Sequence, residues 1–394
     1  MDVLAYILIL IGFLALLHAY VVYPALMRIL AKGRMPYHSN SKNDRPRVWI
    51  LMSAFNEERI IEKKLESFDK LTYPESKLEL WIGSDASSDR TDEIIKDFPN
   101  SQIRFFRYED RAGKANVLNR LKAELKSNPN YDESRDIMVM TDANVLFSED
   151  LIENLVAPFQ DDSIGQVGAV IKNYGEDRRG ISYQEKFYIG SENQLKINEG
   201  KAWGTMMGAF GACYAIRAKL IPALRTNFLM EDFYISMNVF DKGYKAVMAE
   251  DAICFEDLPS EVSEEFKRKT RISAGNFQNL SVYYHLLWPP GRLSFSFLSH
   301  KVLRWLGPIW LSFILAGLIL GYSIHGFWLP VLMIYLLLLL SPLLDRIARK
   351  MGLHSVLLRY PAYFVEMNLA LANGFIKYIK GVRTNAWQPT KRND

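Results

Sequence analysis

The signature of the fold lies in residues 47–57, Arg-Val-Trp-Ile-Leu-Met-Ser-Ala-Phe-Asn-Glu. Within it, Val48–Ala54 is a continuous apolar run, which indicates a strand that is buried on both faces. The following residues, Glu57–Phe68, have the apolar spacing of an amphipathic helix. A buried strand that leads into a helix predicts an α/β domain with a mostly parallel sheet.

The same alternation of strand and helix continues to residue 142. Further strands are predicted at Leu78–Ser84, Ile103–Tyr108 and Ile137–Thr141, and helices at Asp89–Phe98 and Lys114–Lys126. Such a pattern is Rossmann-like, with helices on both faces of the sheet. Ligands of these sheets bind at the carboxyl ends of the strands. Asp85 and Asp142 each follow the end of a predicted strand, so we expect both at the ligand-binding edge.

Long apolar segments flank this charged region. Val3–Met27 and Leu306–Leu344 contain no Asp, Glu, Lys or Arg. They predict one transmembrane helix within residues 1–31 and two more, Trp305–Tyr322 and Phe327–Leu344, within residues 301–350. Basic residues follow the first segment closely, so the positive-inside rule places the region between the segments in the cytosol. We therefore expect an integral protein of the plasma membrane or the bacterial inner membrane.

The remaining regions divide at changes in composition. Residues 32–260 read as one globular domain, and residues 261–300 as amphipathic interfacial helices, including a helix around Ser263–Leu287. Within residues 351–394, the apolar stretch Tyr360–Ile376 carries Glu366 and precedes a basic tail. A full span would place that tail outside, so we predict an interfacial or re-entrant helix there.

Bulk composition excludes several classes of protein. Hydrophobic residues make up 49% of the 394 residues, and the net charge is +4 from 48 basic and 44 acidic residues. This balance argues against a disordered chain and gives no sign of a nucleic-acid partner. Cys213 and Cys254 lack metal-ligand spacing, so we expect two buried thiols and no zinc.

Six short polar motifs follow one another through the charged region, several of them at predicted strand ends. They are Ser53–Glu58 (SAFNEE), Ser84–Asp89 (SDASSD), Gly113–Asn116 (GKAN), Thr141–Asn144 (TDAN), Glu231–Asp232, and Arg268–Arg271 (RKTR) with Gly275 and Gln278 after it. Together they resemble the inverting family-2 glycosyltransferases, over about Arg47 to Gln278. That family has a GT-A catalytic domain, which residues 32–260 would form. The apolar flanks resemble its membrane-integrated branch, which includes cellulose, hyaluronan and poly-N-acetylglucosamine synthases.

The resemblance implies a set of residues that bind a nucleotide-diphosphate sugar, with a UDP-sugar as the first candidate. A carboxylate at a strand end can accept a hydrogen bond from a nucleobase N–H, and a cation can neutralise phosphate. The alternative for Asp85, Asp89 and Glu57 is a helix cap, which we favour for Asp89; for Lys114 it is an ordinary solvated lysine. The donor-binding residues implied are Ser53, Glu57, Asp85, Lys114, Asp142 and Arg271.

Asp142 and Asn144 are the candidate metal ligands. Hard oxygen atoms at positions i and i+2 of an extended segment suit Mg²⁺ or Mn²⁺. The family usually has a second aspartate where this chain has Asn144, whose amide oxygen can ligate but carries no charge. The alternative is a purely structural Asp-x-Asn turn.

Asp232 is the candidate general base, because an inverting transfer needs a carboxylate beside the attacking hydroxyl. Glu231 would orient or support it. The family motif is Thr-Glu-Asp, and here Met230 replaces the threonine. The alternative is that the acidic pair only complements the dipole of a helix N-terminus.

Arg271 would bind the diphosphate. Processive members of the family have Gln-x-x-Arg-Trp, and aligning that arginine to Arg271 puts Ile272 at the tryptophan. The alternative is that the basic run 267–271 faces anionic lipid. The small-residue segment Met207–Cys213 resembles the acceptor-site lining of the family, and the alternative is a tightly packed strand. Trp387 is a candidate stacking ring for the site, and the alternative is an interfacial membrane anchor.

These features predict a membrane-bound glycosyltransferase that acts on a glycan or lipid-linked acceptor. The overall layout favours polysaccharide or exopolysaccharide assembly as its role. Ile272, in place of the tryptophan of processive members, argues against polymer synthesis. Transfer of a single sugar to a lipid is therefore the alternative. A non-catalytic membrane scaffold with a decayed transferase domain is the alternative from another class. Membrane lipids are expected partners. A membrane partner subunit is also expected, because three spans are few to form a channel for a polysaccharide product.

Overall fold

The computed structural model describes residues 1–34, 45–173, 182–257, 262–353 and 355–382. The chain divides into two compact units. The sheet-containing unit comprises Met27–Ser260 and Val382–Asp394, and the helical unit comprises Met1–Leu26 and Glu261–Gly381. Most of the predicted basic tail, including Trp387, lies outside the described residues.

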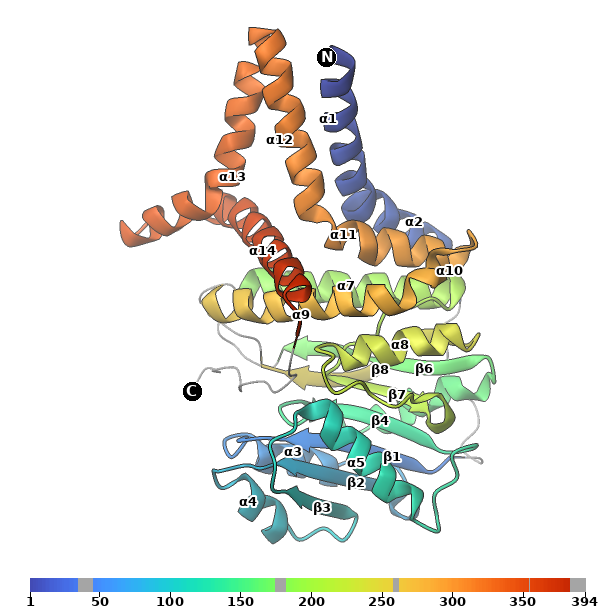
Figure 1. Cartoon of the computed structure of the whole chain (residues 1–394). Coiled ribbons are helices and arrows are strands. Elements are labelled where there is room, and N and C mark those ends of the chain that lie inside the picture. Colours follow the sequence, from blue (N-terminus) through green and yellow to red (C-terminus); the bar gives the residue numbers. More distant parts are fainter. Residues whose placement is uncertain (35–44, 174–181, 258–261, 354, 383–394) are drawn as a thin grey trace. The chain divides into compact units, whose positions relative to one another are not determined.

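An eight-stranded sheet in the order β3-β2-β1-β4-β7-β6-β8-β5 forms the centre of the first unit (Figure 1). Its strands are β1 Val48–Ala54, β2 Leu78–Asp85, β3 Ile103–Tyr108, β4 Ile137–Asp142, β5 Leu146–Phe147, β6 Ile164–Asn173, β7 Cys213–Arg217 and β8 Lys245–Glu256. Strands β3, β2, β1 and β4 pair in parallel, as do β6 and β8. Strand β7 runs antiparallel between β4 and β6, and β5 is antiparallel to β8. The mostly parallel α/β fold is confirmed.

Helices cover both faces of the parallel half. Alternate residues of β1 belong to one apolar core with α3 (Ile61–Asp69) and α6 (Leu151–Val156). On the opposite face, α5 (Lys114–Lys126) packs on β2 at Gly83, where a Cβ atom would lie 2.4 Å from Val117 Cγ1. Every residue of β1 is therefore buried, which explains why its sequence is continuously apolar.

Two helices begin later than their apolar patterns predicted. Helix α3 begins at Ile61 rather than Glu57, and α4 covers Thr91–Asp97 rather than Asp89–Phe98. The carbonyl of Glu57 accepts hydrogen bonds from the amides of Ile60 and Ile61, so residues 57–60 form a turn before the helix. The predicted starts were wrong because the polar residues before each helix bond to the neighbouring loop. Helix α5 has its predicted bounds.

The other two long helices of this unit are α7 (Ser182–Trp203) and α8 (Glu231–Asp241). Helix α8 opens with the acidic pair singled out in the sequence. Cys213 and Cys254 are buried free thiols, as predicted.

The helical unit contains α1, α9 and the C-terminal helices (Figure 1). Their bounds are α1 Asp2–Leu17, α9 Val262–Tyr283, α10 Arg292–Ser296, α11 Leu303–Trp305, α12 Gly307–Ile324, α13 Leu329–Lys350 and α14 Val356–Ile379; α2, Tyr23–Ala31, crosses the boundary between the units. Three helical stretches of the described chain are long and apolar enough to cross a membrane: Asp2–Ala31, Gly307–Ile324 and Gly326–Lys350. Helix α14 is not among them.

Small residues let α1 and α12 approach closely. A Cβ atom on Gly12 would lie 2.6 Å from the carbonyl oxygen of Trp310, and one on Gly317 would lie 2.8 Å from that of Ala5. Close backbone approach at glycine is a common way for helices to pair within a membrane. The first two candidate spans therefore form a packed pair.

Candidate active site

Three of the predicted site residues lie at the ends of adjacent parallel strands. Ser53 is near the end of β1, Asp85 ends β2, and Asp142 ends β4. The strand register pairs Ser53 with Asp142 on one side and with Gly83 on the other. The structure thus gathers these residues at the carboxyl edge of the sheet, where ligands of open α/β sheets bind.

Asp85 fixes the loop that starts α5. Its two carboxylate oxygens accept hydrogen bonds from the backbone amides of Ala112 and Gly113, at 2.7 and 2.9 Å. Gly113 has a φ of 85° and is followed at once by Lys114, the first residue of the helix. Asp85 therefore places Lys114, and its contact with a nucleobase stays a prediction.

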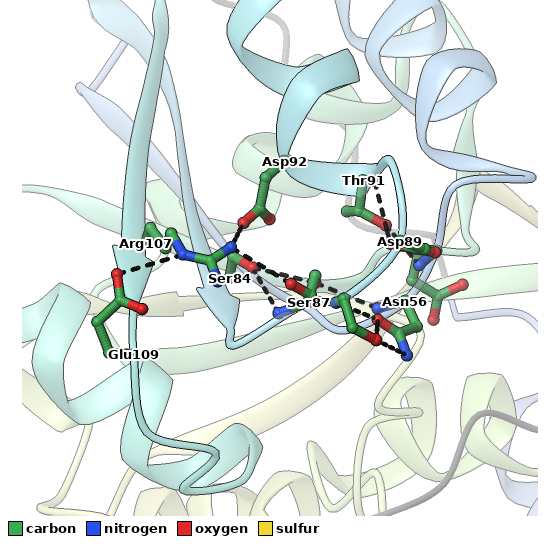
Figure 2. A network of polar contacts seen from close by, with 10 residues as sticks. Asn56, Ser84, Ser87, Asp89, Thr91, Asp92, Arg107 and Glu109 are labelled. Carbon is green, nitrogen blue, oxygen red and sulfur yellow. Dashed lines mark hydrogen bonds and ion pairs between the residues drawn. The ribbon is translucent and has the colours of Figure 1, made fainter.

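Figure 2 shows the polar network that joins the loops after β1 and β2. The amide of Ser88 donates to Asn56 Oδ1 at 2.8 Å, and the amide of Glu58 donates to Asp89 Oδ2 at 3.1 Å. Asn56 and Ala86 have left-handed φ values of 51° and 59°. For an alanine this conformation costs about 1–2 kcal/mol, which the network must offset. The two motif-bearing loops thus form one rigid piece.

The same network holds Glu57 and the start of α4. The amide of Glu57 donates to Thr91 Oγ1 at 2.8 Å, and the Glu57 side chain is buried. Asp89 accepts from both the amide and the hydroxyl of Thr91. Arg107 of β3 pairs with Asp92 from the far side of the loop (Figure 2). Asp89 therefore has a structural role at the start of α4.

Lys114 joins the candidate metal motif to the candidate catalytic motif. Its Nζ lies 2.6 Å from Asp142 Oδ1 and 2.7 Å from Glu231 Oε1. Burial lowers the pKa of this ammonium, but the charges of Asp142 and Glu231 more than offset that effect, so the pKa of Lys114 stands well above its usual value. Lys114 is therefore a fixed cation, and the solvated-lysine alternative is wrong.

Asp232 lies beside this ion pair, in the first turn of α8. The backbone amide of Phe233 donates to Asp232 Oδ1 at 2.7 Å. Burial and the negative charge of Glu231 raise the pKa of Asp232 to about 6, while Lys114 and the Phe233 amide act in the opposite direction. A carboxylate with this pKa is ionised at neutral pH and is a stronger base than an ordinary aspartate.

The small-residue segment Met207–Cys213 packs against the same turn of α8. A Cβ atom on Gly211 would lie 2.8 Å from Asp232 Oδ2, and one on Gly208 would lie 2.6 Å from the ring of Phe233. The amide of Ala209 also donates to Ser236 Oγ at 3.1 Å. The glycines are needed so that this backbone can approach Asp232. The segment as a whole is a loop before β7, and the prediction that it lines the acceptor site remains open.

Asn144 follows Asp142 by two residues, and its side chain is buried. The amide nitrogen of Asn144 donates to Glu256 Oε1 at 3.3 Å. The amide oxygen, the atom that could bind a metal, is not the atom that contacts this carboxylate. Among the described residues, no three His, Cys, Asp or Glu side chains converge as a preformed metal centre. The available oxygen donors are hard ligands that fit Mg²⁺ or Mn²⁺, but other oxygen atoms would have to complete the coordination shell.

Arg271 belongs to α9 in the helical unit. Its neighbours Arg268 and Lys269 form ion pairs with the buried Glu265, at 2.9 and 3.1 Å. These two side chains are therefore bound within their own helix, which differs from the lipid-facing alternative. The role of Arg271 in binding diphosphate stays a prediction.

Two buried polar residues near this edge, Lys64 and Thr141, were not predicted as site residues. Lys64 lies in the core on α3, and Thr141, quoted only as part of a motif, contacts it. A signal was present, because Lys64 shares the apolar stripe of its helix with Ile61, Leu65 and Phe68. A charged residue at such a position calls for a polar partner in the core.

The fold and the site agree with comparisons to known proteins. Residues 49–224 match the family described as Glycosyl transferase family 2, and residues 137–345, more than half of the chain, match Glycosyl transferase family group 2. This chain is a family 2 glycosyltransferase.

Its curated relatives carry different names, and two of them are named for different products. The chain is 26% identical over 255 residues to the probable glycosyltransferase YdaM of Bacillus subtilis, a match that covers 61% of this chain and 58% of that protein. It is 25% identical over 246 residues to poly-beta-1,6-N-acetyl-D-glucosamine synthase of Staphylococcus epidermidis, covering 61% and 56%. The beta-monoglucosyldiacylglycerol synthase of Trichormus variabilis is 29% identical over 147 residues, covering 36% and 30%. The glycosyltransferase thus matches just over half the length of its first two relatives.

Among solved structures, the mannosyltransferase PcManGT of Pyrobaculum calidifontis, in complex with GDP-Man and Mn²⁺, has the same fold. The TM-score is 0.71 over 96% of this chain and 98% of that one, at 21% sequence identity. This likeness confirms the predicted GT-A fold of the glycosyltransferase. It covers nearly the whole chain, including the apolar helices.

Proposed function

We propose that this glycosyltransferase is a membrane-bound inverting enzyme that moves a sugar from a nucleotide-diphosphate sugar to a glycan or lipid-linked acceptor. A UDP-sugar is the first candidate donor, and polysaccharide or exopolysaccharide synthesis is the first candidate role. The catalytic domain would lie on the cytosolic side. The observation that carries the proposal is the position of the Lys114 ammonium. Its Nζ lies 2.6 Å from Asp142 and 2.7 Å from Glu231, and Glu231 is the residue immediately before Asp232.

On the acceptor side, Asp232 would take the proton of the attacking hydroxyl. That hydroxyl oxygen bonds to the anomeric carbon as the bond to the nucleoside diphosphate breaks, which inverts the configuration. Gly211 leaves room for the acceptor to approach Asp232 Oδ2, because any side chain there would crowd this oxygen. Glu231 would hold Asp232 in place and, through its charge, keep its pKa raised.

On the donor side, Lys114 would neutralise the diphosphate, and Asp85 would keep Lys114 in position. The diphosphate-binding role of Arg271, in the helical unit, stays a prediction. Asp142 and Asn144 would hold Mg²⁺ or Mn²⁺, whose charge stabilises a departing diphosphate. PcManGT, which has the same fold, is described in complex with Mn²⁺ and a nucleotide sugar. This supports both a divalent metal ion and a nucleotide-sugar donor for this protein. Ser53 and Glu57 lie on the strand and loop that border this edge.

A second candidate is the transfer of one sugar to a lipid acceptor. Ile272 stands where processive members have an aromatic residue, and one relative is named for a glucosylated diacylglycerol. A decayed, non-catalytic scaffold is disfavoured, because the charged residues of the candidate site are all present. Lys114 forms ion pairs with Asp142 and Glu231, and the charges of Lys114 and Glu231 affect the pKa of Asp232.

The test is incubation of the purified full-length protein with a panel of nucleotide sugars and Mg²⁺ or Mn²⁺. Release of the nucleoside diphosphate, dependent on an added glycan or lipid acceptor, is the expected result. Mass spectrometry of the product then separates the two candidates, because single transfer adds one sugar and polymerisation adds a ladder. No release from any donor would contradict the proposal.

A further inference from the structure

A buried lysine lies directly beneath the turn that carries Asp142 and Asn144. The side chain of Lys64 is 0% exposed. Its Nζ donates to Thr141 Oγ1 at 3.1 Å and to the Val145 carbonyl at 2.6 Å, and lies 3.3 Å from the centroid of the Phe147 ring. These three contacts match the three N–H donors of an ammonium group. Because Thr141 precedes the turn and Val145 follows it, one side chain holds both ends.

Packing alone does not account for a lysine at this position. Its neighbours on the helix stripe, Ile61, Leu65 and Phe68, are buried apolar residues of the core. Burial of an ammonium group is costly, and here it lowers the pKa of Lys64 to about 7. An aliphatic side chain would avoid that cost, so the lysine must contribute something other than core volume.

The hydrogen bonds from Lys64 continue towards the candidate base. Thr141 Oγ1 donates to the carbonyl of Ala212 at 2.9 Å, and the amide of Asp142 donates to the same carbonyl at 3.2 Å. Ala212 follows Gly211, where an added Cβ atom would lie 2.8 Å from Asp232 Oδ2. A continuous path therefore runs from α3 through the Asp142 turn to the backbone beside Asp232.

We propose that Lys64 is a positioning residue for sugar transfer. Its ammonium clamps the Asp142–Asn144 turn and, through Thr141 and Ala212, fixes the separation between the donor-side turn and the Asp232 carboxylate. The inference rests on the proposed function, since that separation matters only if Asp142 and Asp232 act on the two partners of one reaction. Misplacement of a reacting group by about 1 Å can cost roughly 100-fold in rate.

The first test compares Lys64→Met with Lys63→Met, a matched change at the exposed neighbouring position of α3. Lys64→Met keeps an unbranched apolar side chain, one heavy atom shorter, and removes the ammonium donors. We expect kcat to fall about 10- to 100-fold with an unfolding midpoint close to that of wild type, and Lys63→Met to match wild type in both. A fall in activity that only tracks the folded fraction would show a core residue and overturn the proposal.

A second pair keeps the proposal testable if Lys64→Met does not fold. Thr141→Ser retains the hydroxyl and should retain most of the kcat, whereas Thr141→Val breaks the path and should lower it. Wild-type kcat in both Lys64→Met and Thr141→Val would refute the positioning role alone. Absence of transfer by the wild-type protein would refute the proposed function and the positioning role together.

Discussion

The charge balance of the site depends on one residue, Lys114. Its ammonium pairs with Asp142 and Glu231, and its charge also lowers the pKa of Asp232, against the effects of burial and Glu231. The candidate donor-binding and base motifs are therefore electrostatically coupled. The sequence could predict which residues carry charge at this edge, but it could not predict that one lysine bridges two motifs that are far apart in the chain.

Replacement of Asp232 by asparagine should abolish transfer and leave donor binding intact. The amide cannot accept the proton of the acceptor hydroxyl, and general bases contribute about 10²- to 10⁴-fold. The measurement is kcat together with the affinity for a nucleoside diphosphate. Near-wild-type kcat would show that another group is the base.

The same substitution should raise the stability of the fold at neutral pH. The raised pKa of Asp232 means that the folded state favours the protonated carboxyl, so its stability falls as the pH rises from the ordinary range of aspartate through about 6. A neutral amide removes this penalty. Thermal unfolding at pH 7 should give a higher midpoint for Asp232→Asn, and a lower one would contradict the raised pKa.

The pH dependence of transfer should follow the same group. The base must be ionised to act, so kcat is expected to be flat above neutrality and to fall as the pH drops through about 6. Donor-saturated rates measured between about pH 5 and pH 8 check this expectation. A fall centred near the ordinary pKa of aspartate would show that burial does not perturb Asp232.

Removal of the Lys114 cation should impair both donor binding and stability. Lys114→Met removes the ammonium partner that Asp142 and Glu231 share, which we expect to cost roughly 2 kcal/mol. Lys126→Met is a matched control on the same helix, because Lys126 is exposed and lies 3.9 Å from Glu133. Equal unfolding free energies for the two variants would show that the Lys114 bridge is not formed.

At the scale of elements, the first turn of α8 packs against the small-residue segment, and together they are the proposed acceptor side of the site. Their contact depends on Gly211, which abuts Asp232. Strand β1 was predicted with its observed bounds because a continuous apolar run gives a clear signal. Strand β3 was also predicted with its observed bounds, because its aromatic and β-branched residues favour a strand although two arginines interrupt them. The starts of α3 and α4 were not, because loop-to-loop hydrogen bonds compete with helical ones there. The antiparallel strand β7 has no local signal, because its direction is set by pairing with distant β4 and β6.

Gly211→Ala should therefore lower kcat strongly with little change in donor affinity. The new Cβ atom would lie 2.8 Å from Asp232 Oδ2 and must displace the base or the segment, with a loss of about 100-fold. Gly190→Ala, in α7, meets nothing within 4 Å and should be neutral or slightly stabilising. Wild-type kcat in Gly211→Ala would mean that the close approach does not matter for transfer.

At the scale of the whole molecule, long apolar helices accompany the α/β domain. The described chain has three candidate spans, and two of them pack together through Gly12 and Gly317. The charge-free runs that predicted them are a strong sequence signal, since charged residues are costly inside a bilayer. The acceptor, by contrast, leaves no comparable signal, because small changes in a loop can change it.

The most direct measurement of the central claim is acceptor-dependent nucleotide release by the purified full-length protein, with Asp232→Asn as its matched control. We predict that wild-type protein releases nucleoside diphosphate from at least one nucleotide sugar, that chelation of divalent ions suppresses this release, and that Asp232→Asn releases none above background. Release by Asp232→Asn at the wild-type rate would show that Asp232 is not the base of the transfer.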